Sequence, residues 1–113
     1  MGKIKEINIK SENQTVSLAI GEFLIELDRC KYNKTKLMKV ITGYGSHGKG
    51  GEIKRELVKE LFSLKRKGEI KNYIPCDQLS QEYLHNLCLE NPDLILDNEL
   101  SNYNSGVILV EIE

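Results

Sequence analysis

The chain reads KLMKVITGYGSHGKGG over residues 36–51, and this stretch decides the fold prediction. Residues 36–42 are mostly apolar, β-branched towards their end and followed at once by glycine, which is typical of a buried strand that ends in a tight loop. Five glycines fall within residues 43–51. Residues 52–67 then place apolar side chains at three- and four-residue spacing, which predicts a helix. The sequence here therefore predicts a strand, a glycine-rich loop and a helix in succession.

The segments on both sides of this unit continue the alternation of strand and helix. We expect strands at residues 2–10, with a slip in the alternation near Glu6, at 70–76 and at 107–112, and helices at 14–31 and 79–89. This order, βαβαβ, an insert and a last strand, predicts an α/β two-layer sandwich with a small mixed sheet of about four strands and two main helices. Right-handed crossovers would place both main helices on one face of the sheet if the strands progress in one direction or flank each other symmetrically.

The length and composition set the class of protein. A chain of 113 residues is expected to form one domain, residues 1–113, with an acidic insert at about residues 77–104. Apolar residues make up 40% and charged residues 29%, and no stretch approaches the roughly 18 uncharged apolar residues that a membrane span needs. We therefore expect a cytoplasmic protein without a membrane partner. The three cysteines, Cys30, Cys76 and Cys88, form no CxxC pair and are expected to be reduced thiols without a catalytic role.

Charge is sorted along the chain. Residues 1–75 hold all 16 Lys and Arg against 9 acids, whereas residues 76–113 hold 8 acids and no Lys or Arg. One interpretation is a solvated surface that happens to sort by sign. The other is that the basic part binds phosphates and the acidic part shields or tunes it.

The glycine-rich loop, residues 42–51, is the local sequence with chemical content. Such a loop presents backbone N–H groups and a helix amino end to an anion. Gly43, Gly45 and Gly48 fit GxGxxG, but the chain is too short for a doubly wound dinucleotide fold. The pattern GxxxxGK also fits, yet Gly50 stands where a P-loop needs Ser or Thr for magnesium, so we reject a nucleotide triphosphatase. A plain connecting turn is the remaining alternative.

The same loop resembles the signature of a known family. The TGYG of residues 42–45 and the run to Gly51 are similar to the central motif of the Smr (small MutS-related) domain, where a strand enters TGxG and a glycine-rich loop before a helix. Gly106 before the last strand also matches the family's order. The resemblance implies a fold like the carboxy-terminal domain of translation initiation factor 3. It also implies DNA or RNA as the partner, with endonuclease activity in several members.

The first strand departs from the family pattern. Where the family has LDxH, this chain has INIK at residues 7–10, so that Asn8 replaces the carboxylate and Lys10 the imidazole. An asparagine cannot accept a proton or anchor a metal as a carboxylate does. We therefore expect nucleic-acid binding with hydrolysis impaired.

The site residues follow from the loop and the resemblance. If the domain cuts, Thr42, His47 and Lys10 would orient the phosphodiester, with Mg²⁺ or Mn²⁺ supplying what Asn8 cannot; no other cofactor and no protein metal ligands are predicted. Lysines around the loop, Lys36 and Lys39 among them, would support phosphate binding. The expected nucleic-acid contacts are Gly43, Tyr44, Gly45, Ser46, Gly48, Lys49, Gly50 and Lys54.

A hypothesis of a different class assigns the function to the insert. In it, the protein is a non-catalytic interaction module that docks a basic protein partner through Asp93, Asp97 and Glu99. The glycine-rich loop would then be structural only.

Overall fold

The structure, a computed structural model, describes residues 4–9, 15–43, 49–92, 94, 97, 100 and 106–112. The order of elements confirms the predicted βαβαβ, insert and last strand. Along the chain the elements are β1 (Ile4–Asn8), α1 (Val16–Tyr32), β2 (Leu37–Ile41), α2 (Lys49–Arg66), β3 (Asn72–Pro75), a short 3-10 helix η1 (Cys76–Gln78), α3 (Gln81–Glu90) and β4 (Val107–Glu111).

The sheet has four strands in the order β1-β2-β4-β3. β1 pairs with β2 in parallel, whereas β4 runs antiparallel to both β2 and β3. β1, β2 and β3 therefore point the same way, and their carboxyl ends lie at one edge of the sheet. The sheet is mixed, as predicted, because β4 alone runs in the opposite direction.

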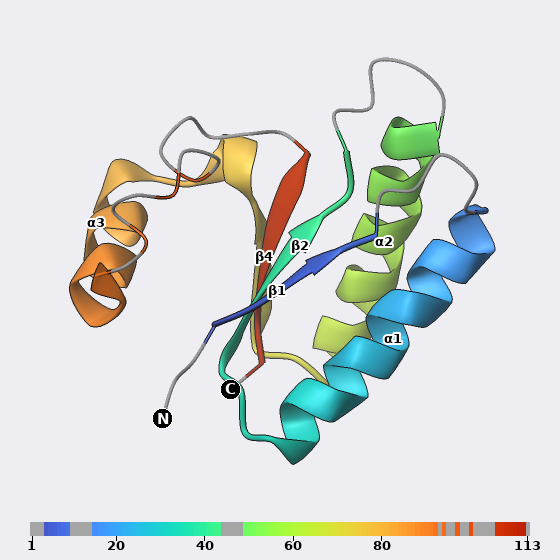
Figure 1. Cartoon of the computed structure of the whole chain (residues 1–113), viewed down its shortest axis with the longest axis horizontal. Coiled ribbons are helices and arrows are strands. Elements are labelled where there is room, and N and C mark those ends of the chain that lie inside the picture. The colour runs from blue at the N-terminus through green and yellow to red at the C-terminus, as the bar shows by residue number, and fades with distance from the viewer. Residues whose placement is uncertain are drawn as a thin grey trace.

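The two main helices cover one face of the sheet (Figure 1). Their buried side chains pack against the residues of β1, β2 and β4 that point to this face. This confirms the arrangement expected for right-handed crossovers between parallel strands. The fully buried or nearly buried side chains of this layer include Phe23 and Leu27 from α1, Ile53, Leu57 and Leu61 from α2, and Met38, Val40, Ile108 and Val110 from the strands.

The insert packs on the opposite face of the sheet (Figure 1). Leu79, Leu87 and Leu100 join a second buried cluster with strand residues such as Leu37 and Leu109. Because both faces are covered, β2 and most of β4 are buried along their length. This explains their near-continuous apolar sequences.

The covered second face also explains the slip in β1. Ile7 and Ile9 belong to the cluster under α1 and α2, whereas Ile4 packs against the cluster under the insert. Successive residues of a strand point to opposite faces, so a strand that is buried on both faces needs apolar residues at odd and at even positions.

One element boundary differs clearly from the prediction. α2 begins at Lys49, three residues before the expected start at Glu52, so the last part of the glycine run is helical. Glycine is a poor helix former, but Glu52 in the first turn interacts favourably with the helix dipole. Within the described residues, no helix has both the length and the apolar composition needed to cross a membrane.

Candidate functional site

The carboxyl ends of the parallel strands bring the predicted loop and the first strand together. Asn8, the last residue of β1, is aligned with Ile41, the last residue of β2. Ile41 is in turn aligned with Val107, the first residue of β4. Ligands of open α/β sheets commonly bind outside the carboxyl ends of the strands. We refer to this end of the sheet, with Thr42, Gly43 and the first turns of α2, as the carboxyl edge.

Thr42 fastens the start of the glycine-rich loop to the turn before β4. Its side chain is fully buried, and its hydroxyl donates to the carbonyl oxygen of Gly106 at 3.0 Å. The Thr42 backbone N–H donates to the same oxygen at 2.7 Å. The hydroxyl that the sequence offered as a group for catalysis is thus used to hold the backbone of the loop.

Gly43 turns the chain out of β2. Its φ is 95°, in the region that residues with a Cβ atom rarely adopt. The first two residues of the TGxG motif therefore have structural roles. The threonine holds the backbone of the loop through its hydrogen bonds, and the glycine permits the turn.

The amino end of α2 completes the carboxyl edge. The first N–H groups of a helix lack partners within the helix, and the helix dipole makes this end attractive to anions. Lys54 lies within the first two turns, and its side chain is 27% exposed. Its ammonium is 3.7 Å from the carboxylate of Asp77, which follows β3 at the same edge. At this separation the two groups form an ion pair without a short hydrogen bond.

Several predicted site residues cannot be placed. Lys49 and Gly50 form the start of α2, but only their backbone is described. Lys10, Tyr44, Gly45, Ser46, His47 and Gly48 lie outside the described residues.

Lys39 was predicted to support phosphate binding, and this expectation is wrong. Its residue is 3% exposed and lies on the face of β2 that the insert covers. The ammonium contacts Glu6 at 3.1 Å and Asp97 at 2.7 Å. Because side chains alternate along a strand, Lys39 points away from α1 and α2. Its ammonium is paired inside the protein and is not available to a phosphate.

The contact with Lys39 also changes the interpretation of the insert. Asp97 was expected to be a solvated acid that could dock a basic partner. Instead it bonds Lys39, and its other carboxylate oxygen accepts the backbone N–H of Leu100 at 3.1 Å. Asp93 and Glu99 lie outside the described residues.

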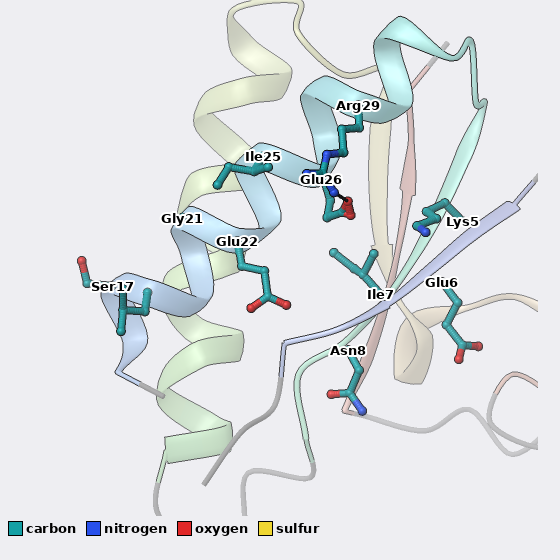
Figure 2. Close-up of a pocket in the computed structure, with 11 residues that line it drawn as sticks. Lys5, Glu6, Ile7, Asn8, Ser17, Gly21, Glu22, Ile25, Glu26 and Arg29 are labelled. Carbon is teal, nitrogen blue, oxygen red and sulfur yellow. Dashed lines mark hydrogen bonds and ion pairs between the residues drawn. The ribbon is translucent and has the colours of Figure 1, made fainter. Parts of the chain in front are cut away.

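A groove of about 730 Å³ lies between β1 and α1 (Figure 2). Ile7 points towards α1, and Asn8 points away from it. The lining carries cations and carboxylates together, and Glu26 and Arg29 form an ion pair at 3.1 Å. The exposed side chains of Leu18 and Ile25 stand on α1 beside it. Sequence reasoning missed this groove, although these two apolar residues interrupt an otherwise polar helix face.

The described residues supply no evident metal or thiol chemistry. No three His, Cys, Asp or Glu side chains among them gather as a metal site would require. Cys30 and Cys76 are buried, in agreement with the predicted structural role. Burial raises the pKa of the Cys30 thiol, although a hydrogen bond with Thr35 opposes the shift. The thiolate form is therefore disfavoured.

Comparison with known proteins gives no further assignment. No protein-family model matches the chain, and no curated protein or solved structure matches it either.

Proposed function

We propose that this protein is an Smr-like domain that binds nucleic acid by contacting phosphates at the carboxyl edge. The observation that carries the proposal is the position of the glycine-rich segment. It joins the buried end of β2 to the amino end of α2, where β1 and β3 also end. Backbone N–H groups, a helix dipole and Lys54 would all act on an anion at this place.

The charge distribution supports a polyanion as the partner. The basic residues that pair inside the protein, such as Lys39, lie away from the carboxyl edge. Lys54 is partly exposed at this edge, where it also pairs with Asp77. Phosphate binding of this kind does not require base-specific contacts.

The proposed activity is binding rather than cleavage. Asn8 ends β1 at the position where the family motif has a carboxylate, and an amide cannot act as a general base. The described residues do not provide a ligand set for Mg²⁺ or Mn²⁺, so no hydrolytic step is derived from them. Endonuclease activity through His47 and Lys10, with Thr42 holding the backbone of the loop, is the second candidate, and it rests on the sequence resemblance.

Binding of labelled single-stranded, duplex and branched DNA and RNA tests the proposal. If about three phosphates are contacted on a single strand, Kd should rise by about 20-fold between 50 and 200 mM salt. Lys54→Ala and Lys49→Ala should each weaken binding and reduce the salt dependence. Lys36→Ala is the matched control: Lys36 was also expected to support phosphate binding, but it lies just before β2, at the end of that strand away from the carboxyl edge.

Two outcomes would change the proposal. If no oligonucleotide binds, or if Lys36→Ala weakens binding as much as Lys54→Ala does, the carboxyl edge is not the binding site. Incubation of the same substrates with Mg²⁺ or Mn²⁺ tests cleavage. Cutting that is lost in His47→Ala would establish the endonuclease.

A further inference from the structure

A second groove lies between α2 and the outer edge of β3. It measures about 630 Å³, a size typical of small-ligand sites. Phe62, Lys65 and Arg66 line it from α2, and Asn72 and Tyr73 line it from β3. We call it the α2/β3 groove. Its lining includes no carboxylate, whereas three line the groove beside α1.

The aromatic ring of Phe62 is unusually accessible. The residue is 54% exposed, although it lies on a helix that buries three side chains almost completely. The guanidinium carbon of Arg66 lies 5.9 Å from the centre of the ring, within the range of a cation–π contact. A cation therefore lies near one side of the ring, and the exposed part of Phe62 offers a surface on which a planar base can stack.

The cations of the groove keep their charge available. Lys65 donates to the side-chain oxygen of Asn72 at 3.0 Å, and this partner is an uncharged amide. Among the described residues, no carboxylate forms an ion pair with Lys65 or Arg66. Glu69, the one acid in the segment from Lys65 to Lys71, bonds Lys31.

One end of the α2/β3 groove lies near the carboxyl edge. Gln78, at the end of η1, lines the groove, and its neighbour Asp77 is the residue that Lys54 contacts. A chain of phosphates that begins at the amino end of α2 could therefore follow the helix past Val58 to Lys65.

We propose that the α2/β3 groove binds single-stranded nucleic acid, with one base stacked on Phe62 and the adjoining phosphates on Lys65 and Arg66. The inference rests on the proposed function and specifies its substrate class. Exposed aromatic rings beside cations bind single strands with little sequence preference, because every base has a face that can stack. A paired duplex keeps its bases stacked on one another and cannot offer one to Phe62.

A tryptophan in place of Phe62 tests the stacking directly. The chain has no tryptophan, so Phe62→Trp introduces a single tryptophan that keeps an aromatic surface and can be excited selectively over the five tyrosines. Titration with the oligonucleotides dT12 and U12 should quench its fluorescence, whereas a 12-base-pair duplex should quench it much less. Leu89→Trp is the matched control, because Leu89 is 67% exposed on α3, which packs on the other face of the sheet. Its fluorescence should not change.

Affinity measurements on the full chain complete the test. Phe62→Ala should weaken binding of dT12 or U12 by about 5- to 100-fold, because one base stack is lost. Lys65→Ala and Arg66→Ala should also weaken binding, whereas Lys59→Ala, an exposed charge that pairs with Glu56 on the same helix, should have a smaller effect. Circular dichroism confirms that each variant is folded.

The outcomes separate this inference from the proposed function. Oligonucleotide binding without quenching at position 62, and without loss in Phe62→Ala, would overturn the groove and leave the carboxyl edge in place. Absence of binding to any oligonucleotide would overturn both. Equal quenching by a poly-glutamate peptide would assign the groove to an acidic protein and overturn the inference.

Discussion

The buried hydroxyl of Thr42 joins two segments that are far apart in the sequence, and we expect it to contribute to stability. In Thr42→Val the shape of the side chain is kept, but the hydrogen bond to Gly106 is lost. The free energy of unfolding should fall by about 1 kcal/mol, the usual net value of one such bond. Urea unfolding measures it. Unchanged stability combined with weaker oligonucleotide binding would instead indicate a direct role for the hydroxyl.

The two carboxylates that pair with the buried ammonium of Lys39 differ in their distance from it and in their exposure. Asp97 lies closer and its side chain is 16% exposed, whereas Glu6 is more than half exposed. Asp97→Asn should therefore destabilise the protein by about 2 kcal/mol, because a charged hydrogen bond in a shielded place is weakened. Glu6→Gln should cost less than about 1 kcal/mol, as for surface ion pairs. Chemical denaturation of the two variants decides, and an equal cost would contradict the assigned burial.

Tyr83 makes the stability of the protein depend on pH in the alkaline range. Its phenol is partly buried and donates to Glu111 at 2.9 Å, and burial followed by this contact raises its pKa above the ordinary value. The unfolded phenol releases its proton near pH 10 while the folded one retains it. Stability from this group is therefore complete below about pH 10 and is lost as the pH rises further.

The absorbance of tyrosinate at 295 nm measures this shift. In the folded protein, Tyr83→Phe should leave the absorbance gained up to about pH 10.5 unchanged. In urea the same substitution should remove one tyrosine's share of the absorbance near pH 10, which provides the control. A loss of that share in the folded protein would show that the phenol titrates normally.

For single residues, the burial of a side chain was easier to predict from the sequence than the ion pairs that it forms. Cys30 and Cys76 are buried, as their apolar contexts predict, whereas Cys88 is only partly buried. Lys39 was misjudged, because a lysine in a strand is usually exposed and the partners that bury it lie 33 and 58 residues away. Long-range pairing of this kind leaves no local pattern.

Two glycines, one inside a helix and one after the end of a helix, should change the stability in opposite directions when each is replaced by alanine. Gly21 lies inside α1 with nothing within 4 Å of the position of a Cβ atom, so Gly21→Ala should stabilise the protein by up to about 1 kcal/mol. Gly68 follows α2 with a φ of 78°, so Gly68→Ala should destabilise it by about 1 kcal/mol. Thermal unfolding of both variants measures the difference. A melting temperature that rises in both would contradict the assigned end of α2.

The elements themselves were largely predictable, and the exceptions have physical causes. α1 and α2 were found from their spacing of apolar residues, and β4 from its apolar run. The insert was the hardest part to predict. Its buried residues Leu79, Leu87 and Leu100 are spread over segments with little regular periodicity. The α2/β3 groove was missed because Phe62 fits the helical apolar pattern, and the sequence cannot show that it faces outwards.

At the scale of the whole molecule, the sheet lies between the two main helices and α3 (Figure 1). α1 and α2, which hold 8 of the 16 Lys and Arg residues, cover one face, and the acidic insert anchors to the other through Leu87 and Asp97 (Figure 1). Asp77, at the start of the insert, nevertheless reaches Lys54 of α2. On this arrangement the candidate contacts with nucleic acid belong to the carboxyl edge and α2.

The measurement that tests this account most directly is a titration of the ¹⁵N-labelled chain with dT12, followed by amide chemical shifts. At 12.9 kDa the chain suits solution NMR. The account predicts the largest shifts at Thr42, Gly43 and the first turns of α2, with smaller ones along α2 to Phe62. Shifts confined to α3, or no shifts at low salt, would contradict nucleic-acid binding at the carboxyl edge.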